Sequence, residues 1–297
     1  MKSVCFLMSG TAHLPYLVVS LYSLRRFWSG KIEVHAWPES FDLAQAIGQD
    51  PRLDAEVILR EPTYRGRNCQ FFDKIKLMRT LDSKSPHLYL DADTKVCGKL
   101  DELLDRARVG FCATQFCNWH SNEGAPRNRI HALLGRESIT QSSVEICLKY
   151  PMPSLNGGVF AAMPNCQPLK VWEEWTQAVL DIFIADETVL HPLQVEFSTL
   201  GSFDVALGGK WNCSPKYQPS YLHDDDVVIR HFHGDSCCRL QKSQKGVDQW
   251  YPMYRRCLEY DIGSMKQWIG FINNKHLTAL EKHYADLKTA GVGTSAG

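Results

Sequence analysis

The sequence lacks any apolar run of the ~18 residues that a membrane-spanning helix needs. It also lacks an excess of charge of either sign, because 33 Lys and Arg balance 33 Asp and Glu. This balance argues against nucleic acid as the main partner. No two of its 11 cysteines have C-x₂-C spacing. An odd number of scattered cysteines favours free thiols in a reducing, cytoplasmic compartment over a disulfide framework or a zinc site.

The length and the remaining composition fit either one large globular domain or one domain with a smaller addition. The 297 residues suffice for a sizeable core, and 44% of them are hydrophobic. We expect the apolar run 4–8 to be a first strand rather than a signal peptide. Strand candidates at 32–36 and 55–59 alternate with helix candidates at 15–24 and 43–47. This rhythm is typical of a parallel sheet with helices on both faces.

The most informative stretch is Leu88 to Val96, in which three apolar residues precede Asp91-Ala92-Asp93. In an extended chain the two carboxylates point the same way. Carboxylates at the carboxyl end of a strand in an α/β sheet suit Mg²⁺ or Mn²⁺. The alternative is a solvated turn, because Asp is common in turns.

A helix predicted over residues 72–81 leads into this acidic stretch and carries Lys74. Its charge can serve a phosphate at the acidic site or simply face solvent. Residues 115–150 show no clear periodicity, and we expect a long polar excursion of the kind that binds substrate or forms a lid.

Asn156-Gly157-Gly158 stands before another apolar run. We expect a turn into a strand whose bare backbone a ligand can approach closely. Apolar residues then recur at helical spacing over 172–182. We predict a helix there that ends at Asp186 and Glu187.

A third informative stretch, 227–235, reads as a strand that ends in two histidines and a glycine. Alternation places His231 and His233 on one face. A lone histidine after a strand is more often structural, but two beside a glycine, in a chain that also has a carboxylate pair, make a metal ligand and a structural histidine equally favoured. The run 224–226 of three aspartates before it is expected to be a solvated turn.

From residue 251 onwards the pattern becomes helical and amphipathic. Such helices can pack on the domain, on a partner subunit of a homo-oligomer, or at the periphery of a membrane, and we favour the domain. We predict a main domain over 1–245, a helical extension over 246–290 and a disordered tail over 291–297.

Assembled, these stretches resemble retaining glycosyltransferases of the GT-A fold, most closely the glycosyltransferase 8 (GT8) family. The similar segments are 74–105, with its lysine-bearing helix and D-A-D-T motif, 156–160, 185–191, 209–212 and 231–234. The chain departs from the family pattern at Cys237, where the family usually has a lysine. Arg239 or Lys242 could take the role of that lysine. The chain departs again at Glu187 and Thr188, where the family has Gln and Asp.

The resemblance implies an α/β GT-A fold: a Rossmann-like mixed sheet of the nucleotide-diphospho-sugar transferase type, with C-terminal helices. It implies transfer of a hexose from a nucleotide sugar, with UDP as the expected nucleotide, to a glycan, lipid-linked or protein hydroxyl with retention. A DXD-type site of Asp91, Asp93 and His231 would bind Mn²⁺, or Mg²⁺, under the departing diphosphate.

The resemblance also implies roles for further residues. We expect donor binding by Ser9, Gly10, Lys74, Ala92, Asn156, Gly157, Gly158 and Gly234. Asp186 and Glu187 are the expected catalytic residues beside the reacting face. Same-face attack is the favoured route to retention, and double displacement through Glu187 stays open.

Two other function classes fit parts of the sequence. A phosphatase of the haloacid-dehalogenase type also uses a strand followed by D-x-D, but it expects Thr where this chain has Lys95. A non-catalytic module that binds sugar nucleotides would also have the acidic pair. Slow hydrolysis or transfer of a bound sugar nucleotide distinguishes an enzyme from such a module.

Overall fold

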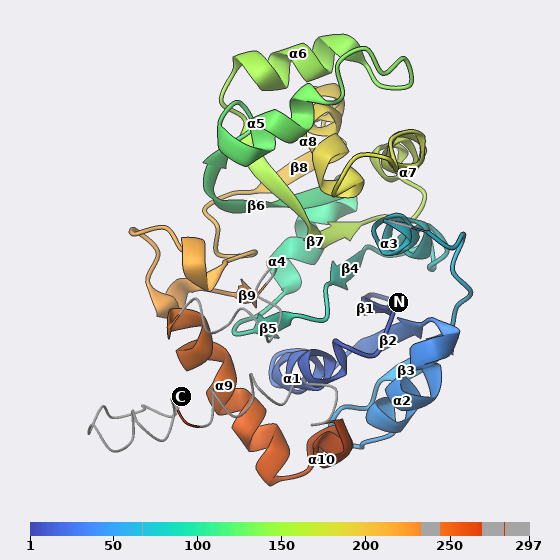
Figure 1. Ribbon diagram of the computed structural model, residues 1–297, viewed down its shortest axis with the longest axis vertical. Helices are drawn as coiled ribbons and strands as arrows, with labels where there is room; N and C mark the ends of the chain where they lie inside the picture. The colour runs from blue at the N-terminus through green and yellow to red at the C-terminus, as the bar shows by residue number, and fades with distance from the viewer. Residues whose placement is uncertain (67, 233–243, 269–281, 283–297) are drawn as a thin grey trace.

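The computed structural model describes residues 1–66, 68–232, 244–268 and 282. Its centre is a seven-stranded sheet with the strand order β3-β2-β1-β4-β7-β6-β8, and β5 and β9 form a separate two-stranded sheet (Figure 1). The strands are β1 Ser3–Met8, β2 Lys31–Ala36, β3 Glu56–Leu59, β4 His87–Leu90, β5 Thr94–Val96, β6 Phe111–His120, β7 Pro153–Ala162, β8 Phe203–Ala206 and β9 Ile229–His231.

Helices cover both faces of the large sheet (Figure 1). One face packs against α1, α2 and α4, and the opposite face packs against α3, α5, α6, α7 and α8. Their bounds are α1 Leu14–Arg25, α2 Pro38–Gly48, α3 Cys69–Arg79, α4 Asp101–Arg106, α5 Gly124–His131, α6 Gln141–Lys149, α7 Gln167–Ala178 and α8 Ala185–Ser198.

The strands β1 to β4 are mutually parallel, and their residues alternate between the two faces. Val4 and Phe6 of β1 belong to the core on one face, whereas Cys5 and Leu7 belong to the core on the other. A strand buried on both faces reads as a continuous apolar run. The strands predicted near 4–8, 32–36, 55–59 and 88–90 are all present.

The other half of the sheet makes it mixed. β7 pairs antiparallel with both β4 and β6, and β8 runs parallel to β6. The mixed α/β architecture predicted from the family resemblance is therefore confirmed, while a wholly parallel sheet, which the strand–helix rhythm alone suggests, is wrong.

Three local predictions differ from the structure. The expected polar excursion over 115–150 contains the second half of β6 and the helices α5 and α6. Asn156-Gly157-Gly158 lies inside β7 rather than in a turn. Asp186 and Glu187 open α8 instead of ending the preceding helix, because the chain reverses at Ile184, whose backbone is left-handed (φ 55°).

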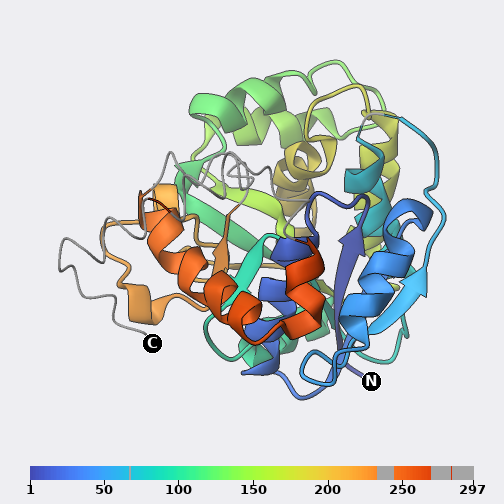
Figure 2. The same ribbon diagram turned by 60° about the horizontal axis from the view of Figure 1, so that its bottom comes forward.

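The C-terminal part of the described chain packs onto the first helix. Helices α9 Gln244–Glu259 and α10 Met265–Trp268 lie against α1 (Figure 2). Trp250 and Tyr254 of α9 belong to the same core cluster as the parallel strands. The predicted domain boundary between 245 and 246 falls inside α9, and the division into domains stays a prediction. The expected disordered tail over 291–297 lies outside the described residues, as does most of the predicted extension beyond 268.

Within the described ranges, the structure contains no helix that combines the length and the apolar character required to cross a bilayer.

Candidate functional site

A cavity of about 540 Å³ opens where β1 and β4 end. Ligands of open α/β sheets bind at the carboxyl ends of the strands. Its walls come from the loop after β1, from α1, α3 and β4, from the middle of β7 and from the start of α8. The lining residues are Leu7, Met8, Ser9, His13, Tyr16, Gln70, Phe71, Lys74, Tyr89, Asp91, Ala92, Asp93, Asn156, Gly157, Gly158, Phe183, Ile184, Asp186, Glu187 and His231.

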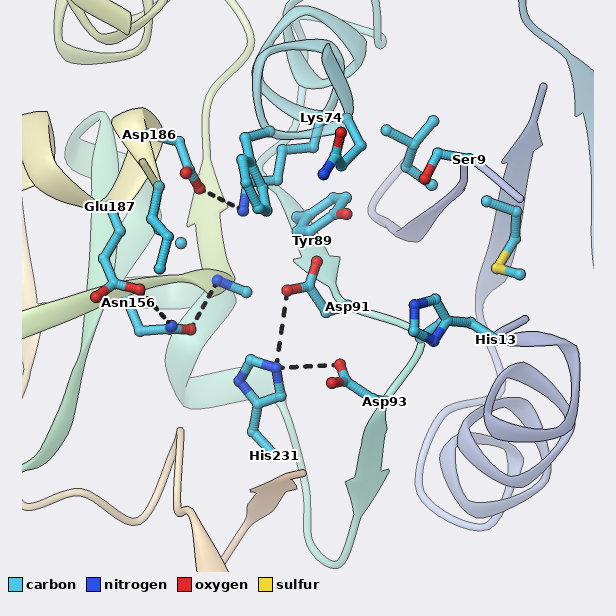
Figure 3. A pocket seen from close by; sticks show the side chains of 18 of the residues that line it. Ser9, His13, Lys74, Tyr89, Asp91, Asp93, Asn156, Asp186, Glu187 and His231 are labelled. Atoms are coloured by element: carbon cyan, nitrogen blue, oxygen red, sulfur yellow. Dashed lines mark hydrogen bonds and ion pairs between the residues drawn. The ribbon is translucent and has the colours of Figure 1, made fainter. Parts of the chain in front are cut away.

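Strand pairing brings the candidate metal ligands together. Asp91 extends the ladder of β4, since its N–H donates to the carbonyl of Gly158 at 2.8 Å. Three residues later the chain enters β5, where Thr94 pairs with His231 of β9. The side chains of Asp91, Asp93 and His231 consequently converge on one point (Figure 3). One ligand atom of each lies within 4.8 Å of the others.

The histidine of this cluster is buried, whereas the carboxylates face the cavity. The His231 side chain is 1% exposed, compared with 32% for Asp91 and 20% for Asp93. Its Nε2 lies 3.1 Å from Oδ1 of Asp93 and 3.7 Å from Oδ2 of Asp91. Its Nδ1 lies 2.9 Å from Oδ1 of Asn212. Two carboxylates and an imidazole form a donor set that suits Mn²⁺ or Mg²⁺.

Electrostatics within the cluster favour a bound cation. Burial raises the pKa of Asp91, and the neighbouring Lys74 and His231 only partly oppose this. For His231, burial alone would lower the pKa, but Asp93 and Asp91 outweigh it and the pKa is raised. The buried charge of Asp91 is therefore only partly compensated, and a divalent cation at this point would compensate it further.

Glycines allow β7 to pass directly under the cluster. A Cβ on Gly158 would lie 2.3 Å from Cε1 of His231 and 2.5 Å from Oδ2 of Asp91. A Cβ on Gly157 would lie 2.6 Å from Oδ2 of Asp186. Any side chain at these two positions would displace the charged groups that line the cavity.

A buried ion pair joins α3 to α8 at the cavity wall. Nζ of Lys74 lies 2.6 Å from Oδ2 of Asp186, and the two side chains are 4% and 1% exposed (Figure 3). Burial would lower the pKa of Lys74, but Asp186, followed by Asp91, raises it above its usual value. Lys74 is therefore a permanent cation beside the acidic cluster. Oδ1 of Asp186 is buried, and no residue in the described part of the chain hydrogen-bonds to it.

Glu187 is held from two sides. Its Oε1 forms an ion pair with Arg129 of α5, and its Oε2 accepts a hydrogen bond from Nδ2 of Asn156 at 2.8 Å. Burial raises the pKa of Glu187, and Arg129 opposes that rise most strongly. Neither oxygen is directed freely into the cavity.

Most of the residues predicted for donor binding and catalysis from the sequence line this one cavity. They are Ser9, Lys74, Ala92, Asn156, Gly157, Gly158, Asp186 and Glu187. Gly10 is in the same loop as Ser9 but is not part of the lining. Gly234, together with His233, Cys237, Arg239 and Lys242, lies outside the described residues.

Sequence reasoning missed several cavity residues. Tyr16 and His13 of the first helix region, and Phe71 and Phe183 on the opposite wall, carry no local motif. Arg129 lies in the stretch 115–150 and Asn212 in the segment 209–212, and neither carries a motif of its own. Their contacts with Glu187 and His231 join distant parts of the chain, so no local spacing could have revealed them.

No protein-family model matches the chain, and no curated protein matches its sequence. Solved structures do match. The galactosyltransferase LgtC, in complex with donor and acceptor sugar analogues, aligns with a TM-score of 0.54 at 16% identity over 86% of this chain and 95% of LgtC. Mouse xyloside xylosyltransferase 1 aligns with a TM-score of 0.54 at 13% identity, over 80% of this chain and 99% of that one.

A third match is the glycosyltransferase GlyE of Streptococcus pneumoniae TIGR4, with a TM-score of 0.50 and 14% identity. It covers 88% of this chain but only 65% of GlyE. At these identities the likeness is one of fold. The chain therefore has the GT-A fold, in the form found in these glycosyltransferases.

Proposed function

We propose that the chain is a metal-dependent glycosyltransferase that moves a hexose from a nucleotide-diphosphate sugar, UDP-sugar being favoured, to a hydroxyl acceptor with retention. The single observation that carries this proposal is the convergence of Asp91, Asp93 and His231 at the ligand-binding edge of a GT-A sheet. The acceptor class, whether glycan, lipid-linked or protein hydroxyl, stays a prediction from the family resemblance.

The charge of the described cavity lining supports the proposed role of a cation. Among the described residues, four carboxylates line the cavity, those of Asp91, Asp93, Asp186 and Glu187, and Lys74 is the one lysine in that lining. A diphosphate would be repelled by this surface. A divalent cation bound by the Asp-Asp-His cluster would supply Lewis-acid stabilisation of the negative charge on the departing diphosphate. Mn²⁺ is favoured by the resemblance.

The chain's own residues then bind and orient the donor. Lys74 adds a fixed positive charge beside the leaving group. Gly157 and Gly158 leave room on β7 for the side chains of Lys74, Asp186, Asp91 and His231, and these side chains are the groups that would face the donor.

Same-face attack is the favoured route to retention. Both oxygens of Glu187 are engaged, one by Arg129 and one by Asn156. A glycosyl ester would have to form through one of these two oxygens, each of which is already bound by a neighbouring side chain. On the same-face route the departing diphosphate accepts the proton of the acceptor hydroxyl. Detection of a glycosyl-Glu187 adduct by mass spectrometry would instead establish double displacement.

The proposal is tested by incubating the protein with a panel of nucleotide sugars and Mn²⁺ and measuring nucleoside diphosphate release. We expect release with one donor class, loss of release with a chelator, and recovery with added Mn²⁺. Asp93→Asn should lower the rate on the order of 100-fold or more, because it removes a charged metal ligand. Asp225→Asn is the matched control, since that carboxylate is exposed in a turn away from the cavity.

Two outcomes would contradict the proposal. Binding of a sugar nucleotide without hydrolysis or transfer would identify a non-catalytic module. Turnover of an aryl phosphate that depends on Asp91 would support the phosphatase alternative.

We also propose a reducing, cytoplasmic location, with membrane-peripheral association left open. The nine cysteines in the described ranges are all free thiols, which fits such a compartment. Assembly into a homo-oligomer stays a prediction.

A further inference from the structure

We propose that Asn212 is a positioning residue for the metal ligand His231, and that a buried chain of hydrogen bonds ending at Arg129 fixes its orientation. The inference rests on the proposed function only in taking the Asp-Asp-His cluster to bind a divalent cation. The inference depends on which ring nitrogen of His231 carries the hydrogen, and this follows from the donor and acceptor roles along the hydrogen-bonded series. These roles are set by groups that can only donate or only accept.

Followed from its Arg129 end, this series of hydrogen bonds starts at the Arg129–Glu187 pair. A guanidinium can only donate, so Glu187 accepts from it on Oε1. The next member, Asn156, has Nδ2 at 2.8 Å from Oε2 of Glu187 and Oδ1 at 2.9 Å from the backbone nitrogen of Gly158. A backbone N–H also can only donate. A flipped amide would place its NH₂ group against the N–H of Gly158, so Asn156 has one allowed orientation.

That orientation determines the orientation of Asn212. Its Nδ2 lies 3.1 Å from Oδ1 of Asn156 and 3.0 Å from the hydroxyl oxygen of Thr114. The Thr114 hydroxyl donates its one hydrogen to the carbonyl of Val159 at 2.7 Å. Both neighbours therefore present only lone pairs to Asn212, and its NH₂ group must face them. Its Oδ1 then faces the histidine.

The direction of the chain decides the state of the imidazole. Oδ1 of Asn212 can only accept, and it lies 2.9 Å from Nδ1 of His231, so Nδ1 carries a hydrogen. In the neutral ring the lone pair is then on Nε2, which faces Asp93 and Asp91. A metal ligand must present such a lone pair. The network thus decides that the neutral ring presents its lone pair to a cation through Nε2.

Burial makes the network hard to replace. Asn212 and Thr114 are 0% exposed and Asn156 is 7% exposed, so water is not on hand to take over their bonds. Partners that orient a metal-ligating histidine commonly contribute 10- to 100-fold, as an order of magnitude, to metal affinity. We expect a contribution of about that size from Asn212.

The test compares Asn212→Leu, which has a similar volume but no acceptor, with Asn212→Asp, which keeps an acceptor for Nδ1. Ser121→Ala is the control, because it also removes a buried side-chain hydrogen bond, to the carbonyl of Cys147, away from the cavity. Two quantities are measured: the Mn²⁺ dissociation constant by electron paramagnetic resonance, and the protonated ring nitrogen of His231 in the metal-free protein. The second comes from long-range ¹H–¹⁵N spectra at alkaline pH, with His231→Gln used for assignment.

We expect Asn212→Leu to weaken Mn²⁺ binding about 10- to 100-fold and to produce a mixture of the two ring tautomers. Asn212→Asp should keep the hydrogen on Nδ1, and Ser121→Ala should change neither quantity. An unchanged dissociation constant in Asn212→Leu would overturn the proposal.

The spectrum of the unsubstituted protein decides the matter even if Asn212→Leu does not fold. A hydrogen on Nε2 of His231 would overturn the proposal, and a hydrogen on Nδ1 would support it. Neither readout requires sugar transfer. A protein that binds Mn²⁺ but releases no nucleoside diphosphate would therefore refute the proposed activity and leave the role of Asn212 intact.

Discussion

At the residue scale, the missing side chains at Gly157 and Gly158 matter as much as the charged groups around them. Both residues lie inside β7 and have no positive φ, so their backbone does not require glycine. The requirement is one of space. The ring of His231 and the carboxylate of Asp91 occupy the volume that a Cβ on Gly158 would need, so the strand and the cluster fit only without it.

Gly158→Ala should therefore weaken Mn²⁺ binding strongly while leaving the protein folded. The added methyl group would lie 2.3 Å from Cε1 of His231 and 2.5 Å from Oδ2 of Asp91, and at least one ligand must move. We expect a loss of affinity on the order of 100-fold, since metal sites depend on accurate placement of their ligands. Titration with Mn²⁺ measures it.

The control is Gly98→Ala, whose Cβ would meet Val228 at an ordinary 3.4 Å. Equal Mn²⁺ affinity in Gly158→Ala and the unsubstituted protein would show that the ligands do not occupy the positions described above.

The same residues show what could be predicted from sequence. The acidic pair could be recognised because its two members are neighbours after an apolar strand. Asn212 and Arg129 could not, because each acquires its role from a contact with a residue more than ten positions away. For Gly157 and Gly158 the sequence predicts a turn, because a sequence does not reveal that another segment packs against a strand at close range.

At the element scale, α8 connects one wall of the cavity to the sheet. Its first turn carries Asp186 and Glu187, and one turn later His191 points toward β7. Nδ1 of His191 donates to the carbonyl of Glu187 at 3.1 Å, and Nε2 accepts the backbone N–H of Leu155 at 3.2 Å. This arrangement requires a neutral ring, because a hydrogen on Nε2 would face the N–H of Leu155.

Stability should consequently fall in mild acid through His191. Burial, followed by the nearby charge of Arg129, lowers its pKa from 6.5 to about 4. Between these values the unfolded chain binds a proton that the folded chain does not, so the free energy of unfolding decreases as the pH falls from about 6.5 to about 4. The full contribution is about 3 kcal/mol. Urea unfolding across this range measures it.

His191→Gln should flatten this part of the pH profile, because its amide keeps hydrogen-bonding capacity but does not titrate. His223→Gln, at an exposed position, should retain the original slope. If the His191→Gln profile paralleled that of the unsubstituted protein, the ring would not be the neutral group described here.

Prediction of elements succeeded where one physical signal dominated. The strands β1 and β4 are apolar on both faces, and α3 has a clear apolar stripe beside Lys74. It failed over 115–150, where β6 contains a bulge at Cys117 with positive φ and the short helices α5 and α6 are mostly polar. The start of α8 was missed because Ile184 occupies a left-handed position that sequences usually mark with glycine or asparagine.

At the scale of the whole molecule, α9 belongs to the main core although it is far along the chain. Trp250 is 1% exposed and stacks on Tyr254, with ring centroids 4.9 Å apart. Its ring centroid also lies 5.0 Å from that of Tyr16 in α1. Tyr16 in turn lines the cavity. The segment after residue 245 therefore supports one wall of the site.

Trp250→Ala should lower the free energy of unfolding by about 3–5 kcal/mol, the usual cost of removing a large buried aromatic side chain. Because α9 shares a core with β1, we expect one cooperative transition, in which far-UV circular dichroism and hydrogen exchange of β1 report the same midpoint. Tyr260→Ala, at a side chain 57% exposed, should change little. Melting of α9 ahead of an otherwise unchanged sheet would instead support the predicted division after residue 245.

The small sheet of β5 and β9 has a further consequence for handling the protein. Each of its strands has only three residues, yet it brings together Asp93 and His231, which are 138 positions apart. A divalent cation bound by both Asp93 and His231 would hold the two ends of the intervening segment together, as a cross-link does. A cation present at 100 times its dissociation constant would stabilise the folded state by about 2.7 kcal/mol. A preparation stripped with chelator should accordingly be easier for proteases to nick near β9, which makes metal content a matter of shelf life as well as of turnover.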